Sequence, residues 1–384
     1  MRFIHTSDWH LGRLMHGEHL TEDQAYVLDQ MKLLARDSRP DALLVSGDVY
    51  DRAVPPPEAV ALLDDFLSFM VLDLDIPVIL IAGNHDSPSR LQFASRVLAG
   101  RNLHVFGSVR LPRSVTFTDS HGPVHVYAVP YAEPVSVREV FQNDEIRDHD
   151  SAMAALTDVV VAGCPADERT ILVAHAFVAG GSPAESERPL SVGGAETVDA
   201  SRFRGFHYVA LGHLHRPQSA GSPRIQYPGS LLKYSFSEAD HSKGVNLVEM
   251  DRDGHCRVER IPLTPRHDVR RIRGLLEDLL KHPDPHKNRE DYLMISLLDV
   301  APILDVMGRL KDVYPNVLHI ERECLAPGVQ NLEGRTDHRK INDMDLFAAF
   351  FSQVTGSELD PAEAAAYGSI VTDLRMADRE AAET

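Results

Sequence analysis

The chain has 384 residues, of which 43% are hydrophobic and 25% are charged, so it is long enough for two or three globular domains. Its 39 basic and 57 acidic side chains give a net charge of −18, which argues against a protein that coats nucleic acid with a basic surface. The charge does not exclude an enzyme that meets phosphate through bound cations. No apolar run approaches the roughly 20 residues of a membrane span. The first strand pattern begins at Phe3, which leaves no room for a signal peptide, so we expect a cytoplasmic protein.

Residues 1–262 alternate short apolar strands with helical patterns, which predicts a first domain built mainly as an α/β sheet structure. Helical spacing covers Glu22–Leu34 and, after a corner at Pro55–Pro57, also Glu58–Met70. Residues 180–194 are rich in Gly, Ser, Pro and Glu and predict a surface loop. The expected strands are 3–6, 42–46, 77–82, 124–129, 171–174, 207–211, 225–227, 244–250 and 256–261.

Beyond residue 262 the pattern changes. Residues 263–325 read strand, helix, strand, helix, strand and predict a small second domain, and the polar residues 326–341 predict a linker. Residues 342–384 predict an acidic tail of two helices, the second opened by Asp360 as N-cap and Pro361 at the first position. Amphipathicity alone leaves open whether the tail packs on the preceding domain or docks on a partner. Its apolar stripes are Leu346, Phe347, Phe350, Phe351 and Val354, then Tyr367, Ile370, Val371 and Leu374.

Five of the predicted strands end in side chains of the types that commonly bind metals. These are Asp8 and His10, then Asp48, Asn84, His175, and finally His213 and His215. Because the carboxyl ends of parallel strands meet at one edge of a sheet, we expect these side chains to surround one site. Carboxylates, imidazoles and an amide without thiolate suit Mn²⁺, Fe²⁺ or Zn²⁺, and a central carboxylate is the natural bridge between two ions about 3.5–4 Å apart.

A single motif of this kind carries little weight, because most of the 20 histidines are expected to be surface or core groups. Five motifs in this order, each directly after a strand, reduce the probability that they occur together by chance to about a few per cent. His85 follows the expected ligand Asn84, and its side chain should point elsewhere. We therefore assign His85 to the phosphoryl transition state or to protonation of the leaving oxygen. Asp86 is expected either to orient His85 or to cap the next helix.

The motifs Asp8-x-His10, Gly47-Asp48, Gly83-Asn-His-Asp86, His175 and Gly212-His-x-His215 resemble the signature of the calcineurin-like metallophosphoesterases. The runs 6–12, 47–51 and 227–236 narrow the resemblance to the SbcD-type nuclease subunits of double-strand-break repair. The resemblance implies an α/β sandwich of two mixed β-sheets flanked by helices, with a small α/β capping domain and a helical C-terminal tail.

The resemblance also implies a ligand set and an activity. One metal ion would be held by Asp8, His10, Asp48 and His215, a second by Asp48, Asn84, His175 and His213, and His85 would be catalytic. The implied activity is a two-metal, Mn²⁺-dependent 3′→5′ exonuclease on duplex DNA and an endonuclease on single strands and hairpins, in repair, replication and recombination. Some relatives carry a histidine where this chain has Asp51, so we expect Asp51 to lie behind the ligands or only to bond the loop.

The implied partner is an SbcC-type ATPase, and this chain lacks the Gly-x-x-x-x-Gly-Lys-Ser/Thr loop of P-loop enzymes. The tail 342–384 is the candidate docking segment, and the family implies a homodimer. Arg13, Arg90 and Lys233 near the motif ends are candidate contacts to DNA phosphates. Two alternatives stand beside the nuclease: a phosphodiesterase or phosphatase on small nucleotides or phosphoproteins, and a non-catalytic DNA-tethering scaffold. The scaffold is disfavoured because all seven ligand positions are filled.

Overall fold

The computed structural model describes residues 1–165, 167–187, 196–284, 287–299, 303–322, 344, 347–348, 351–352, 355 and 357–382, with side chains up to residue 371. The chain divides into two compact units, Met1–Arg270 and Arg271–Thr384. This boundary lies a few residues after the predicted one at 262. Residues 264–267 stay with the first unit because they bond to its first long helix: Gln30 Nε2 donates to the Thr264 carbonyl at 2.7 Å, and His267 pairs with Asp23 at 2.9 Å.

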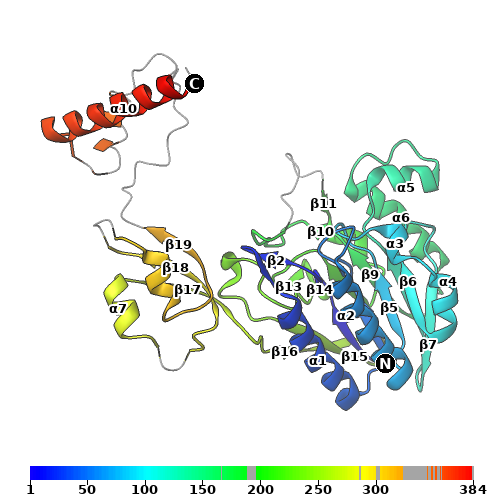
Figure 1. Ribbon diagram of the computed structural model, residues 1–384. Coiled ribbons are helices and arrows are strands. Elements are labelled where there is room, and N and C mark those ends of the chain that lie inside the picture. Colours follow the sequence, from blue (N-terminus) through cyan, green and yellow to red (C-terminus); the bar gives the residue numbers. More distant parts are fainter. Residues whose placement is uncertain are drawn as a thin grey trace. The chain divides into compact units, whose positions relative to one another are not determined.

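The first unit contains two six-stranded sheets (Figure 1). In the first sheet four neighbouring strands are parallel, and two further strands extend it in antiparallel fashion. In order across the sheet these are β16 (Cys256–Pro262), β15 (Gly244–Met250), β1 (Arg2–Thr6), β4 (Ala42–Val45), β5 (Val78–Ile81) and β6 (Leu103–Phe106).

The second sheet is also mixed, but it has a parallel centre and one antiparallel strand at each edge. Its order is β13 (Gln218–Ala220), β14 (Ser222–Tyr227), β12 (Tyr208–Gly212), β9 (Arg169–His175), β8 (Gly122–Val129) and β7 (Ser114–Asp119). The two mixed sheets agree with the predicted sandwich. Strands β6, β7 and β13 were not predicted.

The sheets pack face to face through a shared apolar core. It includes Phe3, Leu44, Ile79 and Ile81 of the first sheet and Val126, Ile171, Val173 and Ala210 of the second. Leu43 and Leu80 alternate with these residues and are also fully buried, so the first sheet is covered on its outer face as well. Helices α1 (Thr21–Ser38) and α2 (Pro57–Ser68) cover that outer face, and α5 (Pro134–Phe141) and α6 (His149–Gly163) pack on the second sheet (Figure 1).

Shorter elements complete the first unit. Helix α2 continues as a π-helical turn over Phe69–Asp73, and α3 (Pro88–Leu91) and α4 (Ser95–Leu98) follow β5. Two small ribbons are β2 (Leu14–Met15) with β3 (Glu18–His19), and β10 (Phe177–Val178) with β11 (Thr197–Val198). Single 3₁₀ turns cover Ala99–Arg101, Ala200–Phe203 and Phe236–Glu238. None of the described helices is both long enough and apolar enough to cross a membrane.

The second unit has its own core of Leu276, Leu293, Ile295, Leu297, Leu310, Tyr314 and Val317. Its three-stranded sheet has the order β17 (Val269–Gly274), β18 (Tyr292–Leu297) and β19 (Val317–Arg322), with α7 (Leu276–Lys281) and α8 (Val306–Lys311) between them in the chain. This is the strand–helix order that the sequence indicates. The predicted linker 326–341 lies outside the described residues.

The tail contains helix α10 (Pro361–Ala382), which starts as predicted. The Asp360 carboxylate accepts hydrogen bonds from the backbone N–H groups of Ala362 and Glu363, each at 2.8 Å. The Phe347 ring stacks on Tyr367 of this helix at a centroid distance of 3.8 Å. The two apolar stripes therefore meet at this pair. Leu346, Phe350 and Val354 of the first stripe lie outside the described residues.

Candidate metal centre

The side chains that the sequence selects lie together at one edge of the sandwich. Asp8 and His10 follow β1, Asp48 follows β4, Asn84 follows β5, His175 ends β9, and His213 and His215 follow β12. Each of these strands belongs to the parallel part of its sheet, so their carboxyl ends face the same way. The two sheets are joined at this edge, where Ser46 Oγ donates to the Ala210 carbonyl at 3.0 Å.

A first group of donor atoms forms around His10 and His215. The Nε2 atoms of these rings lie 3.0 Å apart, and His10 Nε2 lies 3.7 Å from Asp48 Oδ2. Ligand atoms of Asp8, His10 and His215 all lie within 4.8 Å of one another. All these side chains are buried. This group corresponds to the first ligand set that the family resemblance implies.

A second group forms around Asn84. Its Oδ1 atom lies 2.9 Å from His175 Nε2 and 3.0 Å from His213 Nδ1. His175 Nε2 lies 3.5 Å from Asp48 Oδ2, the same oxygen that faces His10 in the first group. Asp8, Asp48 and His175 also offer ligand atoms within 4.8 Å of one another. Asp48 therefore faces both groups, as a bridging carboxylate must.

The backbone is strained where these residues leave their strands. Asp8, His10, Asp48 and His213 all have positive φ, at 53°, 46°, 49° and 107°. Non-glycine residues adopt such angles at a cost of about 1–3 kcal/mol each, and they gather at functional sites. At Gly47, with φ of 89°, an added Cβ would collide with the His175 ring, so the loop passes close behind the ligand. The strain turns the side chains toward a common point.

The electrostatics of the centre fit a divalent cation. Burial lowers the pKa of His175, but the attraction of Asp48 outweighs it and raises this pKa to about 9. Burial lowers the pKa of His213 to about 3, so this neighbouring ring is neutral. Burial raises the pKa of Asp8. Burial would also raise the pKa of Asp48, but the attraction of His175 outweighs it and holds this pKa well below the usual range, so Asp48 is a buried anion. Buried charge is costly unless it is paired or coordinates a metal. The donor set and its charge therefore fit metal ions.

The candidate ligands are held by groups behind them. His175 Nδ1 donates to the Ser46 carbonyl at 2.7 Å. His215 Nδ1 instead lies 2.6 Å from Ser186 Oγ, which contacts Glu238, and Glu238 pairs with Lys243. The sequence reasoning missed Ser186, Glu238 and Lys243. Ser186 lies in a predicted loop without a pattern, and a lone Glu or Lys after a strand-rich run carries no metal-site signal.

Asp51 has a defined place. Its Oδ1 atom lies 3.6 Å from His10 Nδ1 and accepts a hydrogen bond from Arg13 Nη1 at 2.9 Å. Burial alone would raise its pKa, but His10 and Arg13 hold the pKa of Asp51 at about 2. Asp51 therefore lies behind His10 as an ionised group, which is one of the two roles expected for it.

His85 points away from Asn84, as expected. Its ring lies edge-on to His10 with the centroids 4.6 Å apart, and its Nδ1 lies 2.8 Å from the Asp51 carbonyl. A carbonyl only accepts, so Nδ1 carries a proton and Nε2 is the nitrogen that can exchange one with substrate. The His85 backbone N–H donates to Asp48 Oδ1 at 2.8 Å, which fixes the turn.

Asp86 connects two loops and does not cap the next helix, which was one of the two roles expected for it. Its carboxylate accepts backbone N–H groups of Gly83, Val49 and Tyr50 at 2.9–3.1 Å, so it ties the loops after β4 and β5 together. Helix α3 has no side-chain N-cap bond, so Asp86 does not cap it, and the His85 ring is placed by the Asp51 carbonyl. Burial, and then repulsion by Asp48, raise the pKa of Asp86 to about 7 despite these three donors.

The three candidate phosphate contacts differ. Arg90 is exposed on α3. Arg13 bonds Asp51 and the Ser186 carbonyl and lies over the Tyr234 ring at 5.3 Å. Lys233 pairs with Asp268 at 2.8 Å and donates to the Ala239 carbonyl at 2.6 Å, so its ammonium is occupied by structural acceptors. We no longer put Lys233 forward as a phosphate contact.

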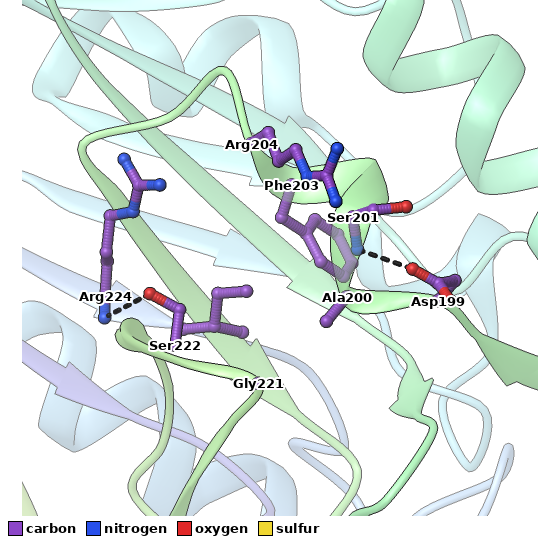
Figure 2. A pocket seen from close by; sticks show the side chains of 9 residues that line it. Asp199, Ala200, Ser201, Phe203, Arg204, Gly221, Ser222 and Arg224 are labelled. Atoms are coloured by element: carbon purple, nitrogen blue, oxygen red, sulfur yellow. Dashed lines mark hydrogen bonds between the residues drawn. The ribbon is translucent and has the colours of Figure 1, made fainter.

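A separate pocket of about 370 Å³ lies at the opposite end of β12 and β14 (Figure 2). Its lining residues precede β12 or lie at the start of β14, whereas His213 and His215 follow β12. Arg204 and Arg224 flank it, and Ser201 N–H donates to Asp199 at 2.7 Å. None of the residues that line this pocket belongs to the candidate centre.

The family is decided by comparison with known sequences. The family model described as calcineurin-like phosphoesterase matches residues 1–217, and one described as type 5 capsule protein repressor C-terminal domain matches residues 265–355. The SbcD subunit of the SbcCD nuclease from Staphylococcus epidermidis is 32% identical over 359 residues, which cover 94% of this chain and 95% of that protein. This chain belongs to the SbcD family of calcineurin-like phosphoesterases.

Two solved structures are also similar to this SbcD-family chain. A dimetal phosphatase from Danio rerio is 14% identical, with a TM-score of 0.42, and the match covers 69% of this chain and 99% of that one. The protein TT1561 of Thermus thermophilus is 16% identical, with a TM-score of 0.38, and the match covers 67% of this chain and 98% of that one.

Proposed function

We propose that this chain is the nuclease subunit of a DNA repair complex and hydrolyses phosphodiester bonds with two divalent cations, Mn²⁺ above others. The observation that carries the proposal is the pair of donor groups that share Asp48, one with His10 and His215 and the other with Asn84 and His175. Membership of the SbcD family supports DNA as the substrate. We propose both 3′→5′ exonuclease and single-strand or hairpin endonuclease activity, in repair, replication and recombination.

The residues divide the work. Asp8, His10, Asp48 and His215 would hold one cation, and Asp48, Asn84, His175 and His213 the other. When bound, the two cations would polarise the phosphoryl group and lower the pKa of an attacking water. Six of the seven side chains are buried, and Asp8, His10, Asp48 and His213 have strained backbone, so the donors are held before substrate arrives and little reorganisation is needed during reaction.

His85 would serve the leaving group. Its Nδ1 is held by the Asp51 carbonyl at 2.8 Å, which fixes the ring and leaves Nε2 to meet substrate. In its protonated form His85 would stabilise charge on the phosphoryl oxygens and give its proton to the departing oxygen. Arg13 and Arg90 remain proposed contacts to the phosphate backbone.

The test uses the purified chain with end-labelled hairpin DNA, duplex DNA and a small cyclic or ester nucleotide, each with Mn²⁺ or Mg²⁺. We expect Mn²⁺-dependent cleavage of hairpin and duplex ends, and faster cleavage in the presence of an SbcC-type ATPase. The Asp48→Ala variant is the inactive control. Preferential cleavage of the small nucleotide would favour the phosphodiesterase alternative, and absence of all cleavage by the complex would leave only a tethering role.

The tail is our candidate for the partner contact. Residues 343–384 carry nine acidic and two basic side chains. Phe347 stacks on Tyr367, while Ile370 on the second stripe is 58% exposed. We propose that residues 342–384 dock on the ATPase after the linker 326–341, and that the chain forms a homodimer in the cytoplasm. Deleting 342–384 should abolish co-elution with the ATPase and keep Mn²⁺-dependent cleavage. Undiminished co-elution of the shortened chain contradicts this docking site, and a single-chain mass by light scattering contradicts the dimer.

A further inference from the structure

The ring of His215 is held by a row of three side chains from two parts of the sequence. Ser186 Oγ lies between His215 Nδ1, at 2.6 Å, and Glu238 Oε1, at 2.5 Å. The other oxygen of Glu238 accepts a hydrogen bond from Lys243 Nζ. His215, Glu238 and Lys243 are 1%, 0% and 6% exposed, and Ser186 between them is partly buried.

The main chain around the same histidine is held too. The Glu187 carboxylate accepts the His215 backbone N–H at 2.6 Å, and Lys243 Nζ donates to the His215 carbonyl at 2.7 Å. Arg13 donates to the Ser186 carbonyl at 3.1 Å and so places the serine. The position of the ring is therefore fixed from both the backbone and the side chain.

The protons of this row can be assigned from donor and acceptor chemistry. Lys243 has only donors, and a carboxylate beside a buried ammonium has only acceptors. Ser186 has one hydroxyl proton, which must go to Glu238 because that oxygen cannot donate. The serine oxygen can then only accept from His215, so His215 Nδ1 carries a proton. Nε2 keeps its lone pair, and Nε2 is the atom that lies 3.0 Å from His10 Nε2 in the first donor group.

We infer that Ser186, Glu238 and Lys243 form a positioning relay that fixes the tautomer and orientation of His215 and thereby sets the affinity of the first metal position. The inference rests on the proposed function in taking His215 as a metal ligand. A carboxylate or carbonyl behind a metal-binding histidine commonly plays this part, and losing such a group weakens metal binding about 10–100-fold. Here the serine hydroxyl lies between the carboxylate and the ring: it donates to Glu238 and accepts from His215 Nδ1.

The relay is tested by Mn²⁺ binding to the full-length chain without DNA, measured by titration calorimetry. We expect Ser186→Ala to weaken one of two binding events about 10–100-fold and to leave the other unchanged. Ser186→Thr keeps the hydroxyl and should bind as the wild type does. Ser182→Ala is the matched control, because Ser182 lies on the same loop, is exposed, and bonds Gln218 through its backbone N–H and carbonyl, which the substitution keeps.

A second measurement reads the tautomer itself. In ¹⁵N-histidine NMR of the metal-free wild type, the His215 Nδ1 signal should be that of a protonated nitrogen, and Ser186→Ala should shift it toward a mixture. Three results overturn the relay: wild-type affinity in Ser186→Ala, equal loss in Ser186→Ala and Ser186→Thr, or an Nε2-protonated ring in the wild type. Failure of the nuclease proposal is separate, because it would appear as a wild-type chain that binds Mn²⁺ and does not cleave DNA.

Discussion

The two halves of the metal centre are supported in different ways. His175, in the half around Asn84, is held by the Ser46 carbonyl, a main-chain group that no substitution removes directly. His215, in the other half, is held by side chains, and two of them, Glu238 and Lys243, lie beyond the residues 1–217 matched by the phosphoesterase family. The first arrangement belongs to the sheet itself. The second is added by the later part of the same unit.

This difference means that the halves can be separated by mutation. A ligand held by the main chain changes only when the loops around it move, as at Gly212, where an added Cβ would collide with the Ser46 carbonyl. A ligand held by side chains can be loosened one hydrogen bond at a time. Asp48 belongs to both halves and His85 to neither. Substitution of Asp48 should therefore affect both metal positions, and substitution of His85 should affect neither.

The largest effect is expected where the halves meet. Asp48→Ala removes the carboxylate whose Oδ2 lies 3.7 Å from His10 and 3.5 Å from His175. Loss of Mn²⁺-dependent DNA cleavage should exceed about 10⁴-fold, the upper range for a single acid–base group. Both Mn²⁺ binding events should weaken in calorimetry. Weakening of one event alone would show that Asp48 is not shared.

A smaller effect on rate is expected at His85, which contacts the centre through ring packing and a backbone bond. His85→Asn should reduce the cleavage rate about 10²–10⁴-fold, as expected for loss of a general acid. Both Mn²⁺ affinities should stay near wild type, unlike those of Asp48→Ala. Turnover at the wild-type rate would remove His85 from the mechanism.

The support of His215 should also appear in stability. Glu238→Gln leaves the Lys243 ammonium buried without its carboxylate, and breaking a buried pair in this way costs about 3–5 kcal/mol. Urea unfolding of the metal-free chain measures this change. The matched control is Glu249→Gln, because the Glu249–Arg2 pair is exposed and such pairs contribute about 0–1 kcal/mol. Equal losses in the two variants would contradict a special role for burial.

An ion pair remote from the centre should contribute a stability between those of the buried and the exposed pair. Asp119 accepts two hydrogen bonds from Arg169, which hold its pKa below the usual range. A lowered folded-state pKa stabilises the fold above the unfolded-state pKa of about 3.9 and loses this effect as the pH falls. Asp119→Asn should cost about 1–3 kcal/mol at pH 7, and the gap to wild type in thermal unfolding should shrink below about pH 4. A gap that is constant with pH would mean that charge is not its cause.

The sequence indicated the fold because strand patterns and polar strand ends are local signals. Asp48 directly follows a short apolar run, and parallel topology then carries it beside His175 without further information. Asp86 shows where this reasoning ends. Its three backbone donors come from two loops, and no local spacing predicts that a carboxylate will tie them together.

The residues behind the ligands could not be predicted from the sequence for the same reason, because contacts between distant loops leave no local pattern. Ser186 contacts His215 across 29 positions and Glu238 across 52, so their meeting depends on how the loops fold back over the sheet edge. Strand β7 was missed for a different reason. Its side chains alternate between half-buried and exposed, as on an edge strand, but only Val115 and Phe117 are apolar, so the alternating signal is short.

The direction of β15 has a consequence for the order in which the centre is completed during synthesis. This strand runs antiparallel to β1, with Asn246 opposite His5, so its first residues and the preceding Lys243 come to the ligand edge. All seven expected ligands have been synthesised once the ribosome passes His215. The relay behind His215 requires 28 residues more, up to Lys243, which directly precedes the strand that pairs with β1. A growing chain thus holds every ligand before it can close the site, and the oldest and one of the youngest segments of the unit close it together.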